Sequence, residues 1–129
     1  MDPLIPIENV LEDREVREQQ AQKLSDKELK EKLHNSTARS GERKATSTVY
    51  DRSPYVVEYT LRRANGVCEL CSNLAPFKKK NGTPYLECHH VQWLSKGGLD
   101  TIENTVALCP NCHRKMHSVN LRRDKDFLL

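Results

Sequence analysis

Two cysteine pairs with the same internal spacing, Cys68-x-x-Cys71 and Cys109-x-x-Cys112, constrain the fold of this chain more than any other feature. Two residues between thiolates allow a tight turn to aim both sulfurs at one tetrahedral ion, and two such turns complete a closed zinc site. Because 37 residues separate the pairs, the segment between them must itself be structured. The spacing predicts a structural Zn²⁺ ion held by four cysteines; a redox pair or a disulfide is the alternative.

A metal cross-link suits a compact part of this size. Residues 48–121 are no longer than the ~70–80 residues at which a hydrophobic core alone becomes sufficient. The whole chain has one Trp, two Phe and four Tyr, so a core must be thin. The fifth cysteine, Cys88, is expected to be a small buried side chain.

The N-terminal sequence has neither a positively charged start nor an apolar run of signal-peptide length. We therefore expect a cytoplasmic protein, in which paired cysteines bind metal more often than they form disulfides. No stretch approaches the ~18 apolar residues of a membrane span, which predicts that the protein has no membrane partner.

Charge divides the chain into an acidic and a basic part. Residues 1–35 carry six basic and nine acidic side chains, a balance of −3, whereas residues 36–129 carry fifteen basic and nine acidic ones, a balance of +6. Ser25-Asp26-Lys27-Glu28 has the form of a capping box, so residues 1–47 are expected to be a charged arm of one or two helices with a linker. A partly disordered arm is the alternative. A basic, cysteine-rich remainder is compatible with a polyanionic partner.

The basic part shows signals for both helices and strands. Ser53-Pro54 is a helix start, and Gly66 is the expected stop. Residues 85–89 and 105–108 are predicted to be strands, and a short helix is expected over residues 110–119.

Four of the five histidines lie within the thirty residues from Cys88 to His117. His113 and His117 are four residues apart on the expected helix, with about 6 Å between their Cβ atoms, a spacing that suits two ligands of one ion. His89 and His90 are neighbours at the end of the first strand, so both reach one site only if the strand breaks there. The alternative is that two or three of these histidines are surface residues or helix caps.

One ordered set of polar side chains, placed between and beside the two cysteine pairs, resembles the motif of the HNH nucleases, which have the ββα-metal fold. The resemblance extends through RRANGVCELC, APF, GTPYLECHH and GGLDTIENTVALCPNCHRKMH, and is close to the HNH domain of the McrA-like, 5-methylcytosine-specific restriction endonucleases. The residues that carry it are His89, His90, Asn104, His113 and His117.

The resemblance implies an α+β fold. A small ββα-metal (HNH) nuclease domain over residues 48–121 would be stapled by the four-cysteine zinc site. The charged helical arm, residues 1–47, would precede it, and residues 122–129 would form a C-terminal tail.

The resemblance also implies roles for single residues. His90 resembles the general base, and Asn104 resembles the middle residue of the motif, whose amide ties the loop together and holds the base in place. The implied catalytic set is His90, Asn104 and His113. The implied ligands of a catalytic divalent ion (Mg²⁺, Mn²⁺, Ni²⁺ or Zn²⁺) are His89, His113 and His117, of which His117 is a third ligand or a phosphate contact. Candidate contacts to DNA phosphates are Arg114, Lys115 and Lys96.

These expectations describe a metal-dependent HNH endonuclease that hydrolyses DNA phosphodiester bonds, with the restriction of modified DNA as one biological setting. The alternative is a non-catalytic zinc module that binds nucleic acid or protein. The presence of both His90 and Asn104 favours the nuclease. DNA is the expected partner, and the N-terminal arm is a candidate binding segment for a protein partner.

Overall fold

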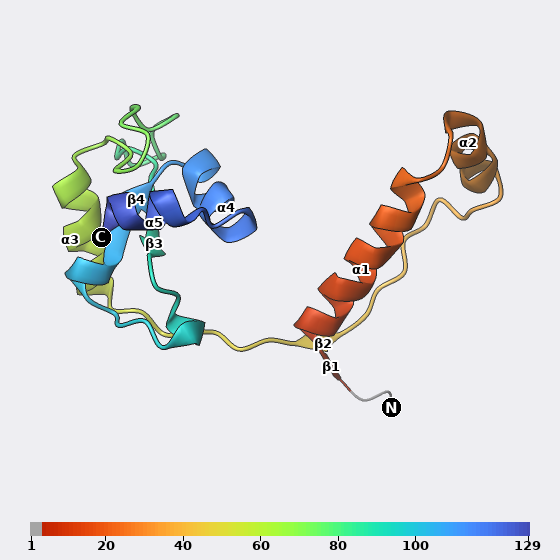
Figure 1. The fold of residues 1–129 in the computed structure, drawn as a ribbon, viewed down its shortest axis with the longest axis horizontal. Coiled ribbons are helices and arrows are strands. Elements are labelled where there is room, and N and C mark those ends of the chain that lie inside the picture. Colours follow the sequence, from red (N-terminus) through yellow and green to blue (C-terminus); the bar gives the residue numbers. More distant parts are fainter. Residues whose placement is uncertain (1–3) are drawn as a thin grey trace. The chain divides into compact units, whose positions relative to one another are not determined.

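The computed structural model describes residues 4–129 and divides the chain into two compact units, Met1–Val49 and Tyr50–Leu129 (Figure 1). Among the described residues, every helix is too short or too polar to cross a membrane.

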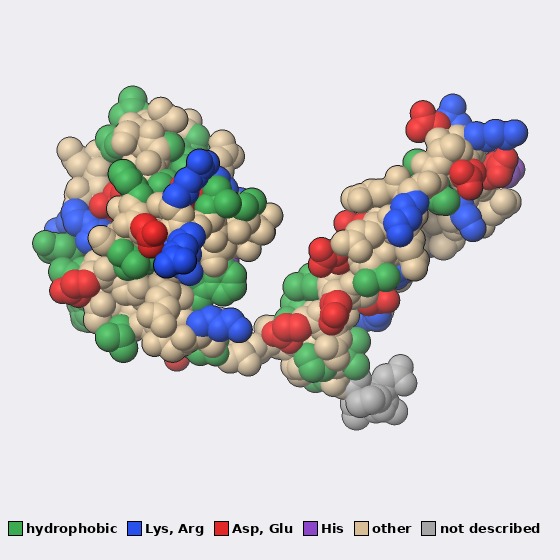
Figure 2. All heavy atoms as spheres, in the orientation of Figure 1, with side chains coloured by type: hydrophobic (Ala, Val, Ile, Leu, Met, Phe, Trp, Pro, Cys, Tyr) green, Lys and Arg blue, Asp and Glu red, His purple; other side chains and the backbone are tan. Residues whose placement is uncertain are grey.

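The first unit contains two helices, α1 (Ile7–Gln22) and α2 (Asp26–His34). The capping box predicted from the sequence is confirmed: Ser25 Oγ accepts a hydrogen bond from the backbone N–H of Glu28, whose carboxylate accepts one from the N–H of Ser25. Neither helix has a buried residue. Figure 2 shows acidic and basic side chains interspersed along both helices, so the unit is held by local hydrogen bonds rather than by a core.

A short strand pair joins the two ends of the first unit. β1 (Ile5–Pro6) pairs in parallel with β2 (Ala45–Thr46), which lies in the segment expected to be an irregular linker. The guanidinium of Arg43 lies 3.2 Å from the carboxylate of Asp13 in α1. The predicted linker therefore folds back on the first helix.

The second unit begins with the helix that the sequence predicted. Ser53 Oγ caps it by accepting from the N–H of Val56, and Asn65 and Gly66 end it with φ angles of 50° and 80°. The elements of this unit, in chain order, are α3 (Pro54–Ala64), β3 (Glu87–His90), the single-turn 3₁₀ helices η1 (Leu94–Lys96) and η2 (Ile102–Asn104), β4 (Thr105–Leu108), α4 (Pro110–Ser118) and α5 (Arg122–Leu128).

β3 and β4 form a two-stranded antiparallel sheet in which His89 lies opposite Val106 and His90 opposite Thr105. The first strand starts two residues later than predicted and continues through His90. Its start is delayed because the N–H of Tyr85 donates to the carbonyl of Phe77 in the preceding loop. The strand does not break between the two histidines, so their side chains start from opposite faces of the sheet.

The core of the second unit is small and includes sulfur atoms. Met116 of α4 is fully buried, and Leu128 of α5 packs against this core. The C-terminal residues, predicted to be a tail, form α5, in which buried Asp124 lies 3.1 Å from the ammonium of Lys115. The buried core residues are Cys68, Leu86, Val91, Val106, Ala107, Leu108, Cys109 and Met116.

Arg63 of α3 connects three segments of this unit. Its guanidinium binds both carboxylate oxygens of Glu69 at 2.9 and 3.0 Å and donates to the carbonyls of Ile102 and Thr105 at 3.0 and 2.7 Å. Glu69 in turn exchanges two hydrogen bonds of 2.9 Å with the backbone of Ala107. The first cysteine turn is therefore attached to β4 by the hydrogen bonds of Glu69, and to α3 by its ion pair with Arg63.

Replacing Arg63 with alanine is expected to lower the free energy of unfolding by roughly 2 kcal/mol, because it removes the ion pair with a half-buried carboxylate and two hydrogen bonds to backbone carbonyls. Arg62→Ala is the matched control. Its ion pair with Glu58 is 80% and 59% exposed, so its loss should cost less than about 0.5 kcal/mol. Thermal melts of both zinc-loaded variants test this, and equal melting temperatures would contradict it.

Candidate metal centres

The four paired cysteines form one cluster in the second unit. Their sulfurs all lie within 4.8 Å of one another, and those of Cys71 and Cys109 are 3.9 Å apart. Four sulfurs about 2.3 Å from a tetrahedral zinc ion are separated by roughly 3.8 Å, whereas a disulfide needs about 2.05 Å. The cysteine cluster, which comprises Cys68, Cys71, Cys109 and Cys112, therefore fits a zinc ion as predicted.

Backbone amides favour the ionisation of one thiol of the cysteine cluster, that of Cys68. Burial opposes the ionisation of Cys68, but hydrogen bonds from the backbone of Cys109, Cys71 and Leu70 outweigh it and lower its pKa to about 7. Burial raises the pKa of both Cys109 and Cys112. A first thiolate is thus stabilised by the fold, and further thiolates need a cation at the centre of the cluster.

A second cluster lies where β3 faces α4. His89, His113 and His117, here called the histidine cluster, each offer a ring nitrogen within 4.8 Å of the others. The Nε2 atoms of His113 and His117 are 3.0 Å apart. Two nitrogens at about 2.1 Å from one ion are separated by roughly 3.0–3.4 Å. The three rings thus have the spacing of ligands on one divalent ion.

The electrostatics of His89 favour the same conclusion. Its side chain is buried, and its Nε2 has no hydrogen-bond partner among the described residues. Burial, followed by the neighbouring imidazoles of His113 and His117, lowers its pKa to about 4, so the ring is neutral near pH 7. A buried nitrogen without a partner is costly, and a bound cation would remove that cost.

The cysteine cluster positions the histidine cluster. Cys109 caps α4, with its sulfur 3.4 Å from the N–H of Cys112, and the N–H of His113 donates to the carbonyl of Cys109. The first turn of α4 therefore carries two sulfurs of the cysteine cluster and one imidazole of the histidine cluster. The ring of His89, from β3, lies 5.0 Å from the ring of His113 and 5.0 Å from that of His117.

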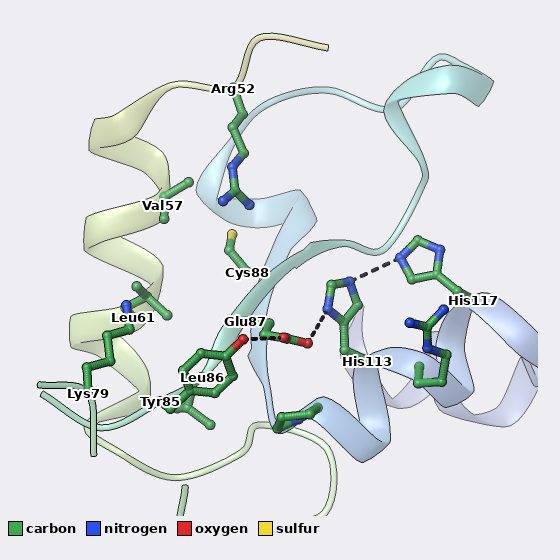
Figure 3. A pocket seen from close by; sticks show the side chains of 12 residues that line it. Arg52, Val57, Leu61, Lys79, Tyr85, Leu86, Glu87, Cys88, His113 and His117 are labelled. Atoms are coloured by element: carbon green, nitrogen blue, oxygen red, sulfur yellow. Dashed lines mark hydrogen bonds and ion pairs between the residues drawn. The ribbon is translucent and has the colours of Figure 1, made fainter. Parts of the chain in front are cut away.

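Two residues that the sequence analysis did not single out orient His113. Figure 3 shows Tyr85, Glu87, His113 and His117 joined in one row of contacts. Tyr85 Oη donates to Glu87 Oε2 at 2.7 Å, and Glu87 Oε1 lies 2.9 Å from His113 Nδ1. Hydrogen bonds from Tyr85 and then His113 keep the pKa of Glu87 below its usual value. A carboxylate only accepts, so Nδ1 carries the proton and Nε2 is free to bind an ion.

Replacing Glu87 with alanine is expected to raise the dissociation constant of the second ion roughly 10- to 100-fold, the usual effect of losing a carboxylate that orients a histidine ligand. Titration calorimetry with Mn²⁺, on protein that already holds zinc in the cysteine cluster, measures this. The exposed Glu103 provides the control variant Glu103→Ala. Equal affinity in the two variants would contradict the orienting role.

His90 and Asn104 lie at opposite ends of the loop between the strands. His90 Nε2 is 2.8 Å from Asp100 Oδ1. The Asn104 amide accepts from the N–H of Gln92 at 2.9 Å and donates to the carbonyls of Gln92 and Leu99 at 3.0 and 2.8 Å, so it closes the loop. A side chain at Gly98 would meet the Gln92 carbonyl at 1.9 Å, which explains the glycine there.

Two cavities border the histidine cluster. One of about 370 Å³ is lined by all three clustered histidines and by His90 and Trp93. The other, of about 590 Å³, has His113 and His117 on one side and Arg114 beside them. Two further cations, Arg52 and Lys79, also line it (Figure 3). Arg52 precedes the first cysteine pair and lies outside the motif, so spacing offered no signal for it.

The three predicted phosphate contacts lie in different surroundings. Arg114 borders the larger cavity. Lys115 points to Asp124 instead, at 3.1 Å. Lys96 is exposed at the end of η1 and has no ion pair among residues 4–129. The structure therefore brings only Arg114 next to the histidine cluster.

Two antiparallel strands followed by a helix, with one histidine from the sheet and two from the helix around one point, form the arrangement expected of the ββα-metal fold. In agreement, residues 68–118 match the HNH endonuclease family. The protein described here thus contains an HNH domain whose cysteine cluster has zinc-site distances, and its relatives include restriction endonucleases of the McrA type.

Comparisons with individual proteins cover this domain. The chain is 55% identical over 69 residues to the type IV methyl-directed restriction enzyme EcoKMcrA of Escherichia coli (strain K12), across 54% of this chain and 25% of that enzyme. It is 44% identical over 36 residues to anaredoxin of Nostoc sp., across 28% of this chain and 47% of that protein. The solved structure of the type IV phosphorothioation-dependent restriction endonuclease ScoMcrA matches with a TM-score of 0.54 at 36% identity, across 61% of this chain and 18% of that one. The chain thus spans a quarter or less of both restriction enzymes.

Proposed function

We propose that the unit Tyr50–Leu129 is a metal-dependent endonuclease that hydrolyses phosphodiester bonds in DNA and acts in the restriction of modified DNA. The observation that carries this proposal is the convergence of three imidazoles on one point, with a fourth, His90, on the wall of the adjoining cavity. The names of the two McrA relatives, both restriction enzymes directed by a DNA modification, support the choice of substrate.

In this proposal the histidine cluster holds one divalent ion: Mg²⁺, Mn²⁺, Ni²⁺ or Zn²⁺. When bound, that ion would supply Lewis-acid stabilisation of charge on the phosphate and on the leaving 3′ oxygen. His90 takes a proton from the attacking water, an O–P bond forms, the P–O3′ bond breaks, and the leaving oxygen takes a proton from solvent. Asn104 acts indirectly, because its amide closes the loop on which the base depends.

Cationic side chains would bind the DNA backbone. Arg114, Arg52 and Lys79 line the cavity beside His113 and are the first candidates. Lys96 is available at the surface, whereas Lys115 would have to exchange Asp124 for a phosphate. Such contacts make binding weaker as salt increases.

A plasmid-nicking assay tests the proposal. Full-length zinc-loaded protein is incubated with supercoiled DNA and added Mg²⁺, Mn²⁺ or Ni²⁺, and matched duplexes carrying unmodified cytosine, 5-methylcytosine or phosphorothioate linkages test modification dependence. Nicking that requires an added divalent ion is the expected result. DNA binding without nicking under every condition would contradict it and leave a zinc-binding nucleic-acid module.

We also propose the charged unit Met1–Val49 as a binding segment for a protein partner.

A further inference from the structure

We infer that Asp100 is a positioning residue that holds His90 with its proton on Nε2, so that Nδ1 is the nitrogen left to accept a proton. The catalytic meaning of this inference rests on the proposed nuclease function, but the tautomer itself does not. Asp100 Oδ1 lies 2.8 Å from His90 Nε2, and the side chains are 10% and 25% exposed for His90 and Asp100. The contact is thus largely protected from solvent.

The second oxygen of Asp100 explains why this group stays a carboxylate. Asp100 Oδ2 accepts a hydrogen bond of 2.6 Å from the backbone N–H of Ser53, the residue that caps α3. The hydrogen bond from His90 and then that from Ser53 lower the pKa of Asp100. The positive end of the helix dipole acts in the same direction. An ionised carboxylate accepts but cannot donate, so the imidazole nitrogen facing it must carry a hydrogen.

The segment Asn104-Thr105 anchors both His90 and Asp100. His90 is held by its pairing with Thr105 in β4. Asp100 follows Leu99, whose carbonyl accepts from the Asn104 amide at 2.8 Å, and Asn104 immediately precedes Thr105. The amide of Asn104 therefore positions the carboxylate, and the carboxylate positions the imidazole. This links Asn104 to the base through two hydrogen bonds rather than by direct contact.

A free Nδ1 on a ring that lines the smaller cavity suits proton transfer. His90 borders that cavity together with the histidine cluster, and its Nδ1 has no hydrogen bond to any described residue. Once Nδ1 takes a proton, the ring is an imidazolium whose Nε2–H points at a carboxylate, which stabilises the charge. A carboxylate behind the histidine of a serine protease has the same two effects.

Asp100→Asn separates this role from a merely structural one. Asparagine has a single oxygen, and the N–H of Ser53 requires an acceptor, so the amide nitrogen would face His90 and donate to Nε2. The shape of the side chain is kept while the proton of His90 moves to Nδ1. Asp51→Asn is the matched control, because it removes the same charge from an exposed residue in the segment that leads to Ser53.

The experiment compares full-length wild type, Asp100→Asn and Asp51→Asn, each with zinc content and melting temperature measured first. Long-range ¹H–¹⁵N spectra at about pH 8, where an ordinary imidazole is neutral, report the tautomer of His90. Single-turnover nicking of a DNA duplex, with saturating protein and Mn²⁺, reports the rate of the chemical step. Titration of that duplex with protein, without added divalent ion, reports the DNA affinity.

We expect the Nε2–H form in wild type and in Asp51→Asn, and the Nδ1–H form in Asp100→Asn. The nicking rate of Asp100→Asn should fall roughly 100- to 10,000-fold, the range for a lost general base, with DNA affinity and zinc content unchanged. An Nδ1–H tautomer in wild type overturns the inference even if no variant folds. A rate in Asp100→Asn within threefold of wild type also overturns it. If wild type does not nick DNA, the proposed function fails, and the spectra still decide the role of Asp100.

Discussion

Replacing Cys109 with serine is expected to abolish zinc binding and to unfold the unit Tyr50–Leu129. Its sulfur is a predicted zinc ligand, caps α4 and belongs to the buried core. Structural zinc in small peptides has an apparent binding free energy of about 10–16 kcal/mol near neutral pH. That is as large as the whole stability of a typical domain, about 5–15 kcal/mol. A unit whose core is this thin has no other interaction of that size.

Zinc content after purification and circular dichroism on heating measure this result. Wild type should carry about one tightly bound zinc and melt cooperatively, whereas Cys109→Ser should lose both properties. Cys88→Ala is the matched control: it also removes a buried thiol, but one outside the cysteine cluster, at a cost of about 1 kcal/mol. If Cys109→Ser kept a cooperative transition at the wild-type temperature, zinc would not be what holds the unit together.

Replacing His90 with alanine is expected to lower the nicking rate roughly 100- to 10,000-fold, because His90 is the one imidazole outside the histidine cluster among the described residues that line the smaller cavity. The three clustered histidines would be occupied by the ion, and Trp93 has no basic nitrogen. Zinc content, Mn²⁺ affinity and DNA affinity should not change. The fall therefore belongs to the chemical step and not to binding.

His34→Ala supplies the control, since His34 is the remaining histidine and is exposed at the end of α2 in the first unit. Single-turnover rates at saturating protein separate the chemical step from DNA binding. If His90→Ala nicked DNA at the wild-type rate, His90 would not be the general base, and Asp100 would have no role in catalysis through it. Loss of Mn²⁺ affinity in His90→Ala would instead make His90 a ligand.

Features encoded by short spacings could be predicted from the sequence. Two residues between cysteines, four residues between His113 and His117, and the Ser25–Glu28 box each describe contacts within one turn of chain. Local backbone geometry is the same in any fold, so these patterns keep their meaning out of context. The helix α3 and the strand β4 were predictable for the same reason. The boundary of β3 was not, because Tyr85 pairs with a loop residue that no periodicity reveals.

Most of the charged side chains around the site could not be predicted from such short patterns. Glu87 could have been suspected, since it shares a strand face with His89. Asp100 and Arg52 gave no signal, because the residues around them lie in other elements. Likewise, the ion pair between Lys115 and Asp124 depends on α5, a helix that was not predicted.

Residue types and short spacings thus predicted two sets of candidate metal ligands, and the resemblance to the HNH nucleases added the roles of single residues. Which histidine faces which partner depended on the register of β3 against β4 and on the path of the loop between them. His89 meets α4 and His90 meets Asp100 because neighbouring residues of an unbroken strand point to opposite faces. Contacts between distant segments come from packing the whole domain at once, and no local pattern carries that information.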